Sequence, residues 1–207
     1  MKKSDVEVIE QKTVFQGYFR VDQYKLRHKK FEGGMTEIMT REIFERGHSS
    51  IVLLYDPNLD KVVLIEQFRM GAFAATASPW FSDDYSPWLI EAVAGIIENG
   101  ETPEDVAHRE VVEETGCELL DLIPINKFFI SQGGSSESCF TFLGRVDSTK
   151  AGGIHGITHE HEDIRVFVTD ADEAFDWVRT GKVMNMVLAN VLQWLQINRD
   201  DVRANWS

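Results

Sequence analysis

Hydrophobic and polar residues change their spacing several times along this chain, and each change predicts a different element. The segment from Val6 to about Glu45 is rich in β-branched and aromatic residues, and a Gly33-Gly34 pair interrupts them at a place suited to a hairpin turn. We expect a small antiparallel sheet here.

Two short apolar runs follow, from Ser50 to Tyr55 and from Lys61 to Phe68, separated by the turn-forming segment DPNLD. They predict core strands of a second unit. Residues 71–88 contain small residues, two Ser-Pro-Trp repeats and no sustained period, which favours a loop.

Residues 103–115 then adopt a helical pattern with well-marked ends. Thr102 is suited to the N-cap, with Asp105 three residues later and Pro103 at the favoured first position. Gly116 is suited to the C-terminal stop. The sequence therefore predicts a helix over 103–115.

Strands and helices are also expected in the last third of the chain. The strands are predicted at residues 123–130, 138–146 and 164–169, and the helices at about 171–180 and 184–197. This mixture of elements predicts an α+β or α/β layout.

Composition and charge narrow the class of protein. A chain of 207 residues with 43% apolar content can bury one substantial core and fits a catalytic domain with a smaller accessory element. A formal net charge of −13 argues against a protein that coats nucleic acid or an anionic membrane. Two cysteines, Cys117 and Cys139, are too few for a disulfide framework, and neither a signal peptide nor a membrane span is evident, so we expect a cytoplasmic protein.

The predicted helix carries a cluster of carboxylates. Glu110 and Glu114 are four residues apart and Glu110 and Glu113 three apart, so their side chains gather on one side of the helix. Hard oxygen donors at this spacing suit Mg²⁺, which bridges to substrate phosphates. A divalent ion here would polarise a phosphoryl oxygen and activate a water, which indicates hydrolysis of a phosphoanhydride.

Neighbouring residues fit the same interpretation. Arg109 can pair with Glu113 at i+4, and Glu101 can support that pair, so we expect both to orient the metal ligands. The alternative is a solvated acidic helix face, which the complete spacing from Gly95 to Gly116 makes much less plausible.

That spacing matches the Nudix box, and the chain resembles Nudix hydrolases. Further segments resemble the bacterial ADP-ribose pyrophosphatases of this family over nearly the whole length, and they read TREIFERGH, VVLIEQFRMGAF, GGSSES, GGIHG and EHEDIRV. The resemblance implies a Nudix α/β/α sandwich with a mixed sheet over residues 48–207. It also implies a small N-terminal antiparallel sheet over residues 1–47 that forms a homodimer by exchange, and hydrolysis of ADP-ribose to AMP and ribose 5-phosphate with Mg²⁺, or Mn²⁺ as a substitute.

The resemblance also implies roles for individual residues. The metal ligands would be the backbone carbonyl of Ala94 together with Glu110, Glu114 and Glu162, and Glu113 is a further candidate. Glu160 would be the general base, acting with Glu110 and Glu114. The substrate-binding residues implied in the same way are Tyr18, Phe19, Arg41, Glu42, Arg46, Arg69, Ile96, Ser131, Gly133 and Glu137.

Two departures from the family pattern bear on the substrate. Gln132 stands where the family typically has proline, and the 71–88 segment is longer than its counterpart. Proline fixes φ and lacks an amide donor, so its replacement loosens this loop. Another nucleotide sugar or a dinucleotide is therefore the alternative substrate, and a non-catalytic nucleotide sensor is a third hypothesis that the retained box carboxylates disfavour. A zinc site at His155, His159 and His161 is disfavoured because this short stretch offers no other soft ligand.

Overall fold

The chain folds into two compact units in the computed structural model. The structure describes residues 1–82, 84–157, 159 and 161–206. Unit 1 contains Met1–His48 and Phe128–Cys139, and unit 2 contains Ser49–Lys127 and Phe140–Ser207. Residues 128–139, which the sequence analysis assigned to the catalytic domain, thus contact the N-terminal segment.

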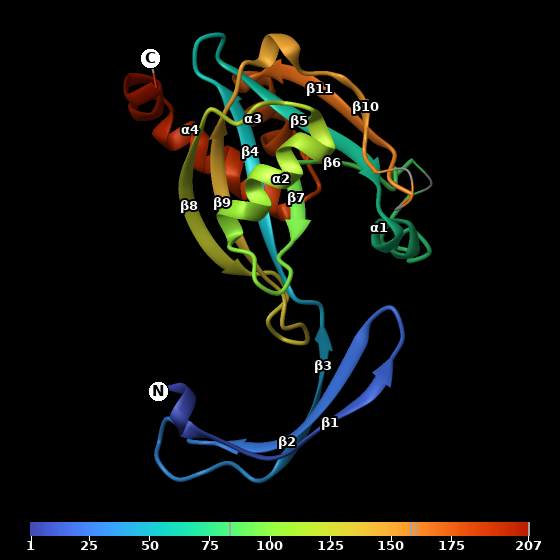
Figure 1. The fold of residues 1–207 in the computed structure, drawn as a ribbon. Helices are drawn as coiled ribbons and strands as arrows, with labels where there is room; N and C mark the ends of the chain where they lie inside the picture. The colour runs from blue at the N-terminus through green and yellow to red at the C-terminus, as the bar shows by residue number, and fades with distance from the viewer. Residues whose placement is uncertain (83, 158, 160, 207) are drawn as a thin grey trace. The chain divides into compact units, whose positions relative to one another are not determined.

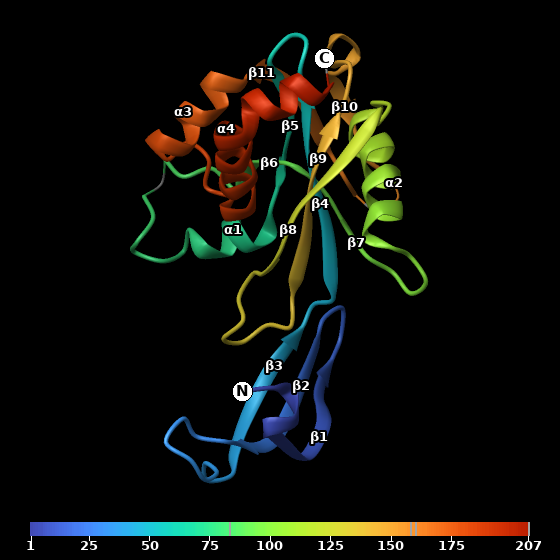
Figure 2. The same cartoon turned by 90° about the vertical axis from the view of Figure 1, so that its left-hand side faces the viewer.

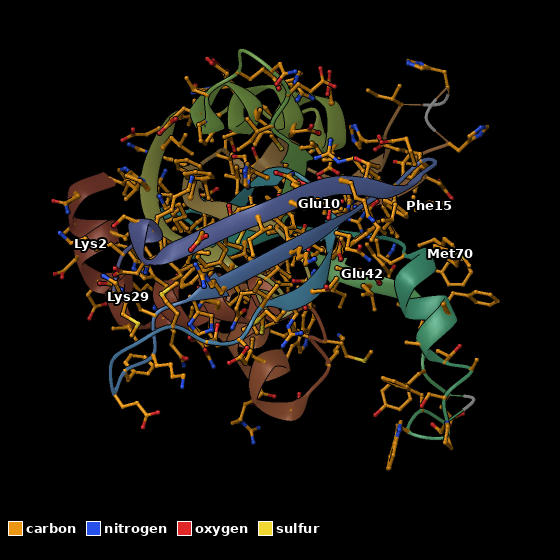
Figure 3. The ribbon with its side chains drawn as sticks, turned by 90° about the horizontal axis from the view of Figure 1, so that it is seen from below. Lys2, Glu10, Phe15, Lys29, Glu42 and Met70 are labelled. Carbon is orange, nitrogen blue, oxygen red and sulfur yellow. The ribbon has the colours of Figure 1, made fainter. Side chains whose placement is uncertain are left out.

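Unit 1 is built on a three-stranded antiparallel sheet in the order β1-β2-β3. Its elements are a short 3₁₀ turn at Lys3–Asp5, β1 (Val6–Gln16), β2 (Arg20–His28) and β3 (Met39–Glu45). The expected antiparallel sheet is confirmed, and Gly33 and Gly34 lie in the β2–β3 connection with φ of 96° and 74°. Figure 3 shows β1 beside β2, with Glu10 and Phe15 on β1 and Glu42 on β3.

This small sheet has almost no core of its own. Every residue of β1 is exposed, and Asp22 is the buried residue among the three strands, all of which the structure describes. Thr13 donates a hydrogen bond of 2.8 Å to Asp22, and Arg20 lies 3.3 Å from it. The apolar side chains of β1 are therefore only partly covered within unit 1.

Unit 2 is built around an eight-stranded mixed sheet in the order β10-β11-β5-β4-β9-β8, with β6 paired to β5 and β7 to β4. The strands are β4 (His48–Asp56), β5 (Lys61–Phe68), β6 (Trp88–Glu91), β7 (Val93–Ile96), β8 (Asp121–Phe129), β9 (Ser138–Arg145), β10 (Gly153–His155) and β11 (Ile164–Asp170). All five strands expected after residue 48 are confirmed, and β6, β7 and β10 were not predicted.

Helices cover both faces of the main sheet. They are α1 (Met70–Ala75), α2 (Pro103–Thr115), α3 (Ala171–Thr180) and α4 (Met186–Trp206), with a 3₁₀ turn at Ser148–Lys150. Figures 1 and 2 show α2 on one face and α3 with α4 on the other. The expected α+β sandwich is confirmed.

Apolar side chains of the helices fill the space against the sheet. Val106, Ala107 and Val111 of α2 are fully buried, as are Val191 and Leu195 of α4. Burial of such side chains is the main favourable contribution to folding. This packing holds α2 rigidly over the strands that carry the candidate site.

Two expectations about the helices were wrong. The start of the 71–88 segment forms the short helix α1, in which Ala72, Ala74 and Ala75 favour helical backbone. The last helix runs to Trp206 rather than to Ile197, because the Trp206 side chain is buried and its Nε1 donates to Asp121 Oδ2 at 2.8 Å. Among the described residues, no helix has the length and apolar character required to cross a membrane.

Candidate active site

Local chemistry sets the bounds of α2, as the sequence predicts. The Asp105 amide donates to Thr102 Oγ1 at 3.2 Å, and the Thr102 amide donates back to Asp105 Oδ2 at 2.9 Å. Pro103 begins the helix, and Gly116 ends it in the left-handed conformation with φ of 65°. Because the caps fix where α2 begins and ends, they also fix the direction in which its carboxylates point.

Glu110 projects from α2 over the backbone of β7. Its carboxylate occupies the space that a side chain at Gly95 would require. Burial raises the pKa of Glu110, and the negative charges of Glu113 and Glu162 raise it further, while Arg109 lowers it. Glu110 is thus held close to the sheet and near other carboxylates.

Glu114 is the most deeply buried carboxylate of the cluster, with only 3% of its surface exposed. Its Oε2 accepts a hydrogen bond of 3.0 Å from the Ala94 amide. Burial is the largest cause that raises the pKa of Glu114, to about 8, and the charges of Glu110 and Glu162 add to it. A protonated or metal-bound Glu114 therefore suits this position better than a free carboxylate.

Arg109 joins the carboxylates of the cluster. Its Nη1 donates to Glu113 Oε2 at 3.2 Å and to Glu110 Oε1 at 2.6 Å, and its Nε donates to Glu101 Oε1 at 3.1 Å. The predicted Arg109–Glu113 pair and its support by Glu101 are confirmed. The contact with Glu110 was not predicted, because residues adjacent in sequence do not share a helix face.

Glu162 lies in the loop before β11. Its Oε2 accepts a hydrogen bond of 3.0 Å from the Ile157 amide, and Gly156, with φ of 101°, allows the close approach of the Glu162 backbone. The charge of Glu162 raises the pKa of Glu110 and of Glu114, so the three carboxylates lie within electrostatic reach of one another. Glu160, the expected general base, lies outside the described residues.

The oxygen donors of this cluster match the chemistry of Mg²⁺. They are hard ligands in a partly buried position, where a divalent cation would offset their mutual repulsion. Among the described residues, no three His, Cys, Asp or Glu side chains already converge as a complete metal site. Glu110 and Glu113 instead contact Arg109, and Glu114 contacts the Ala94 amide. The Ala94 carbonyl as a ligand remains a prediction.

Arg69 follows β5, and its side chain is bound to a carboxylate that the sequence analysis missed. Its Nε and Nη2 donate to Glu91 Oε2 at 2.8 and 2.6 Å. The other oxygen of Glu91 accepts from Asn185 Nδ2 at 2.8 Å. Glu91 is the single charged residue in the apolar run WLIEAVAGI, and this position in the sequence could have identified it as a buried carboxylate. Ile96, also expected at the site, lies at the end of β7 and is partly exposed.

In unit 1, the structure brings three of the expected substrate-binding residues together around one aromatic ring. The Phe19 ring has its centroid 4.8 Å from that of Tyr18 and 4.9 Å from that of Phe44, and Arg46 Cζ lies 5.6 Å from it. Phe44 was missed, although it lies on β3, two residues before Arg46. Tyr18 is 91% exposed and thus available to a ligand.

The remaining expected residues of unit 1 lie on β3 and on the loop that contacts it. Arg41 donates to its neighbour's carbonyl, and Glu42 accepts from Gln23 Nε2 at 3.3 Å. The loop joins β3 through the Phe44 amide, which donates to the Gly134 carbonyl at 2.8 Å. Ser131, Gly133 and Glu137 belong to this loop segment. Arg69 and Ile96, by contrast, belong to unit 2.

Known proteins resemble this chain over its full length. A family model described as NUDIX domain matches residues 45–187. A protein of Escherichia coli (strain K12) named ADP-ribose pyrophosphatase is 44% identical over 99% of this chain and 94% of its own length. A Haemophilus influenzae protein of the same name is 40% identical over 99% of this chain and 92% of its own length.

Two further comparisons extend the picture. An Enterobacter protein named GDP-mannose pyrophosphatase is 30% identical over 93% of this chain and 96% of its own length. The crystal structure of an ADP compounds hydrolase superposes with a TM-score of 0.66 at 17% identity, covering 93% of this chain and 95% of the other. At that identity the superposition supports the fold alone.

Proposed function

Because this chain belongs to the Nudix family, we propose that it hydrolyses the pyrophosphate bond of ADP-ribose to give AMP and ribose 5-phosphate. The observation that carries this proposal is the carboxylate cluster of α2, set against β7, where the charge of Glu162 also acts on Glu114. The 44% identity over the whole chain to a protein named ADP-ribose pyrophosphatase supports the choice of substrate.

Glu110, Glu114 and Glu162 would hold the metal, with the Ala94 carbonyl and Glu113 as further ligands. Bound Mg²⁺, or Mn²⁺ in its place, would neutralise the pyrophosphate and lower the pKa of a bound water. Arg109 keeps Glu113 and Glu110 oriented toward one side of the helix. In our proposal, Glu160 takes the proton from the attacking water as general base.

Unit 1 would bind the nucleotide. The Tyr18 and Phe19 rings can stack on adenine, and the guanidinium groups of Arg41 and Arg46 can form paired hydrogen bonds with phosphate oxygens. In unit 2, Arg69 would serve the phosphates in the same way. Polar groups of Glu42, Ser131, Gly133 and Glu137 in unit 1 are also proposed to bind the substrate. The apolar side chain of Ile96 in unit 2 is proposed as a further substrate-binding group.

We further propose a homodimer through the sheet of unit 1. The support is the exposure of Val8, Val14 and Phe15 on β1, at 52%, 44% and 57%. Exposed apolar side chains on a strand are stabilised when a second chain covers them. Replacing Val8 and Phe15 by serine should convert a dimer to monomers in sedimentation equilibrium. A monomeric wild-type protein at micromolar concentration would contradict this proposal.

The two cysteines support a reducing compartment. Cys117 and Cys139 are free thiols, and both are buried. Free thiols persist where glutathione and thioredoxin keep them reduced. We therefore propose that the protein works in the cytoplasm, which fractionation of cells expressing it at native level can test.

A second candidate substrate is a different nucleotide sugar, such as GDP-mannose. Gln132 in place of the family's proline favours it, as does the 30% identity to a protein named GDP-mannose pyrophosphatase. The ratio of kcat/KM between ADP-ribose and GDP-mannose decides between the two, since specificity is a ratio of these values.

The direct test is incubation of the purified protein with ADP-ribose and Mg²⁺, followed by chromatography of the products. We expect AMP and ribose 5-phosphate in equal amounts, and no turnover after EDTA treatment until Mg²⁺ is restored. Absence of AMP in the presence of Mg²⁺ would reject the proposed function.

A further inference from the structure

Glu91 is a buried carboxylate that the proposed chemistry does not use. It ends β6, and only 5% of its surface is exposed. A buried charge is unfavourable unless other groups pair with it and donate hydrogen bonds to it. The partners of Glu91 are therefore informative about its role.

Both oxygens of Glu91 accept hydrogen bonds from side chains distant in sequence. Oε2 accepts from Nε and Nη2 of Arg69 at 2.8 and 2.6 Å, and from Gln67 Nε2 at 3.4 Å. Oε1 accepts from Asn185 Nδ2 at 2.8 Å. Such charge-assisted contacts with a planar guanidinium determine the direction in which Arg69 points.

Asn185 makes this arrangement rigid. While its Nδ2 donates to Glu91, its Oδ1 accepts from the amides of Val187 and Leu188 at 2.9 and 3.0 Å, at the start of α4. The orientation of the amide group is thus determined from both sides. Glu91 cannot rotate without breaking a contact with a packed helix.

Arg69 still has exposed donor capacity. Its side chain is 41% exposed, although two of its nitrogens contact Glu91. Burial by itself lowers the pKa of Arg69, but the charges of Glu91, Glu114 and Glu162 raise it above its ordinary value. The guanidinium therefore lies in the electrostatic field of Glu114 and Glu162, two of the candidate metal ligands.

We propose that Glu91, held by Asn185, is a positioning residue that directs the free donors of Arg69 toward the phosphate groups of the substrate. This inference rests on the proposed function, because it assigns Arg69 to the same pyrophosphate. Glu91 itself stays buried behind the guanidinium. Its effect on catalysis passes through Arg69.

The decisive experiment is a double-mutant cycle of Glu91→Gln and Arg69→Gln, with KM and kcat measured well below Tm. We expect each single variant to raise KM about tenfold, equivalent to about 1.4 kcal/mol of binding. The double variant should be no worse than Arg69→Gln alone. Groups that act through one another do not have additive effects. The proposal would be overturned if the KM increases of the two single variants multiplied in the double variant. It would also be overturned if Glu91→Gln lowered Tm and left KM unchanged.

A rescue variant separates positioning from folding. In Glu91→Gln, the new amide cannot accept from both Arg69 and Asn185, so one contact is lost. Adding Asn185→Asp supplies an acceptor for the new amide and keeps an oxygen for the start of α4. We expect Tm to recover and KM to return to within about threefold of wild type. Recovery of Tm with KM still about tenfold high would overturn the proposal.

The matched control is Glu66→Gln. Arg165 Nε and Nη2 donate to Glu66 Oε2 at 2.8 and 2.5 Å, the same geometry on the neighbouring strand pair. We expect Glu66→Gln to leave the KM for ADP-ribose unchanged.

If wild-type protein does not hydrolyse ADP-ribose, the proposed function fails. Titration calorimetry with Mg²⁺ and inorganic pyrophosphate still tests the inference in that case. Glu91→Gln should then weaken pyrophosphate binding as much as Arg69→Gln does, and equal affinity in wild type and Glu91→Gln would overturn it.

Discussion

A Cβ atom at Gly95 would lie 1.8 Å from Oε1 of Glu110. Any side chain at this position of β7 would therefore displace the Glu110 carboxylate from its place over the strand. The glycine is required by space alone, because its φ is not among the positive values.

We expect Gly95→Ala to lower kcat/KM for ADP-ribose by about 100-fold, since a shift of about 1 Å in a catalytic group costs this much. Steady-state kinetics with saturating Mg²⁺ measure the loss. Gly71→Ala is the control, because no atom lies within 4 Å of its added Cβ. An unchanged kcat/KM in Gly95→Ala would show that the position of Glu110 is not critical.

The stability of the metal-free protein should depend on Glu114. Burial raises the pKa of Glu114 from 4.5 to about 8. The contribution of Glu114 to the free energy of unfolding is therefore complete below pH 4.5 and is lost as the pH rises through about 8. Chemical denaturation in EDTA should show that the free energy of unfolding decreases by up to about 1.4 kcal/mol for each pH unit as the pH rises from 5 to 8. This decrease should be absent in Glu114→Gln. An identical pH dependence in both proteins would contradict the raised pKa.

We also expect Glu114→Gln to lose activity, because a neutral amide is a poor ligand for Mg²⁺. Removal of a residue that only supports a metal ligand lowers activity by up to about 100-fold. Removal of a ligand itself should therefore lower kcat by at least about 100-fold. Isothermal titration with Mg²⁺ should show weaker binding in parallel. Full activity with normal metal affinity would exclude Glu114 as a ligand.

Glu160→Gln tests the proposed general base. We expect kcat to fall by about 10²- to 10⁴-fold, with a much smaller change in the affinity for ADP-ribose. Single-turnover rates and equilibrium binding separate the two effects. Loss of binding equal to the loss of rate would argue that Glu160 binds substrate rather than takes a proton.

The cap of α2 should contribute to stability. Thr102→Ala removes the side-chain acceptor of the Asp105 amide, and we expect the free energy of unfolding to fall by about 1 kcal/mol. Thr102→Ser keeps the hydroxyl and serves as the control. Urea denaturation of the three proteins measures the difference, and equal stability of all three would contradict the role of the cap.

Part of the fold and of the site follows from local sequence. The bounds of α2 and the Arg109–Glu113 pair depend on residues three to four positions apart, so their spacing predicts them. The short strands β6, β7 and β10 were not predicted, because each has only three or four residues and its pairing partners lie elsewhere in the chain. Tyr18 and Phe19 were expected to bind substrate only by resemblance, and their grouping with Phe44 around the Phe19 ring was not predicted.

The sequence by itself determined that a capped helix presents Glu110, Glu113 and Glu114 on one side, because helix geometry and capping are local. The tertiary structure alone decided that Glu114 is buried against the Ala94 amide, and that Asn185 reaches Glu91 across 94 residues. Burial and distant hydrogen bonds depend on how the whole chain packs, and no spacing within a segment encodes them.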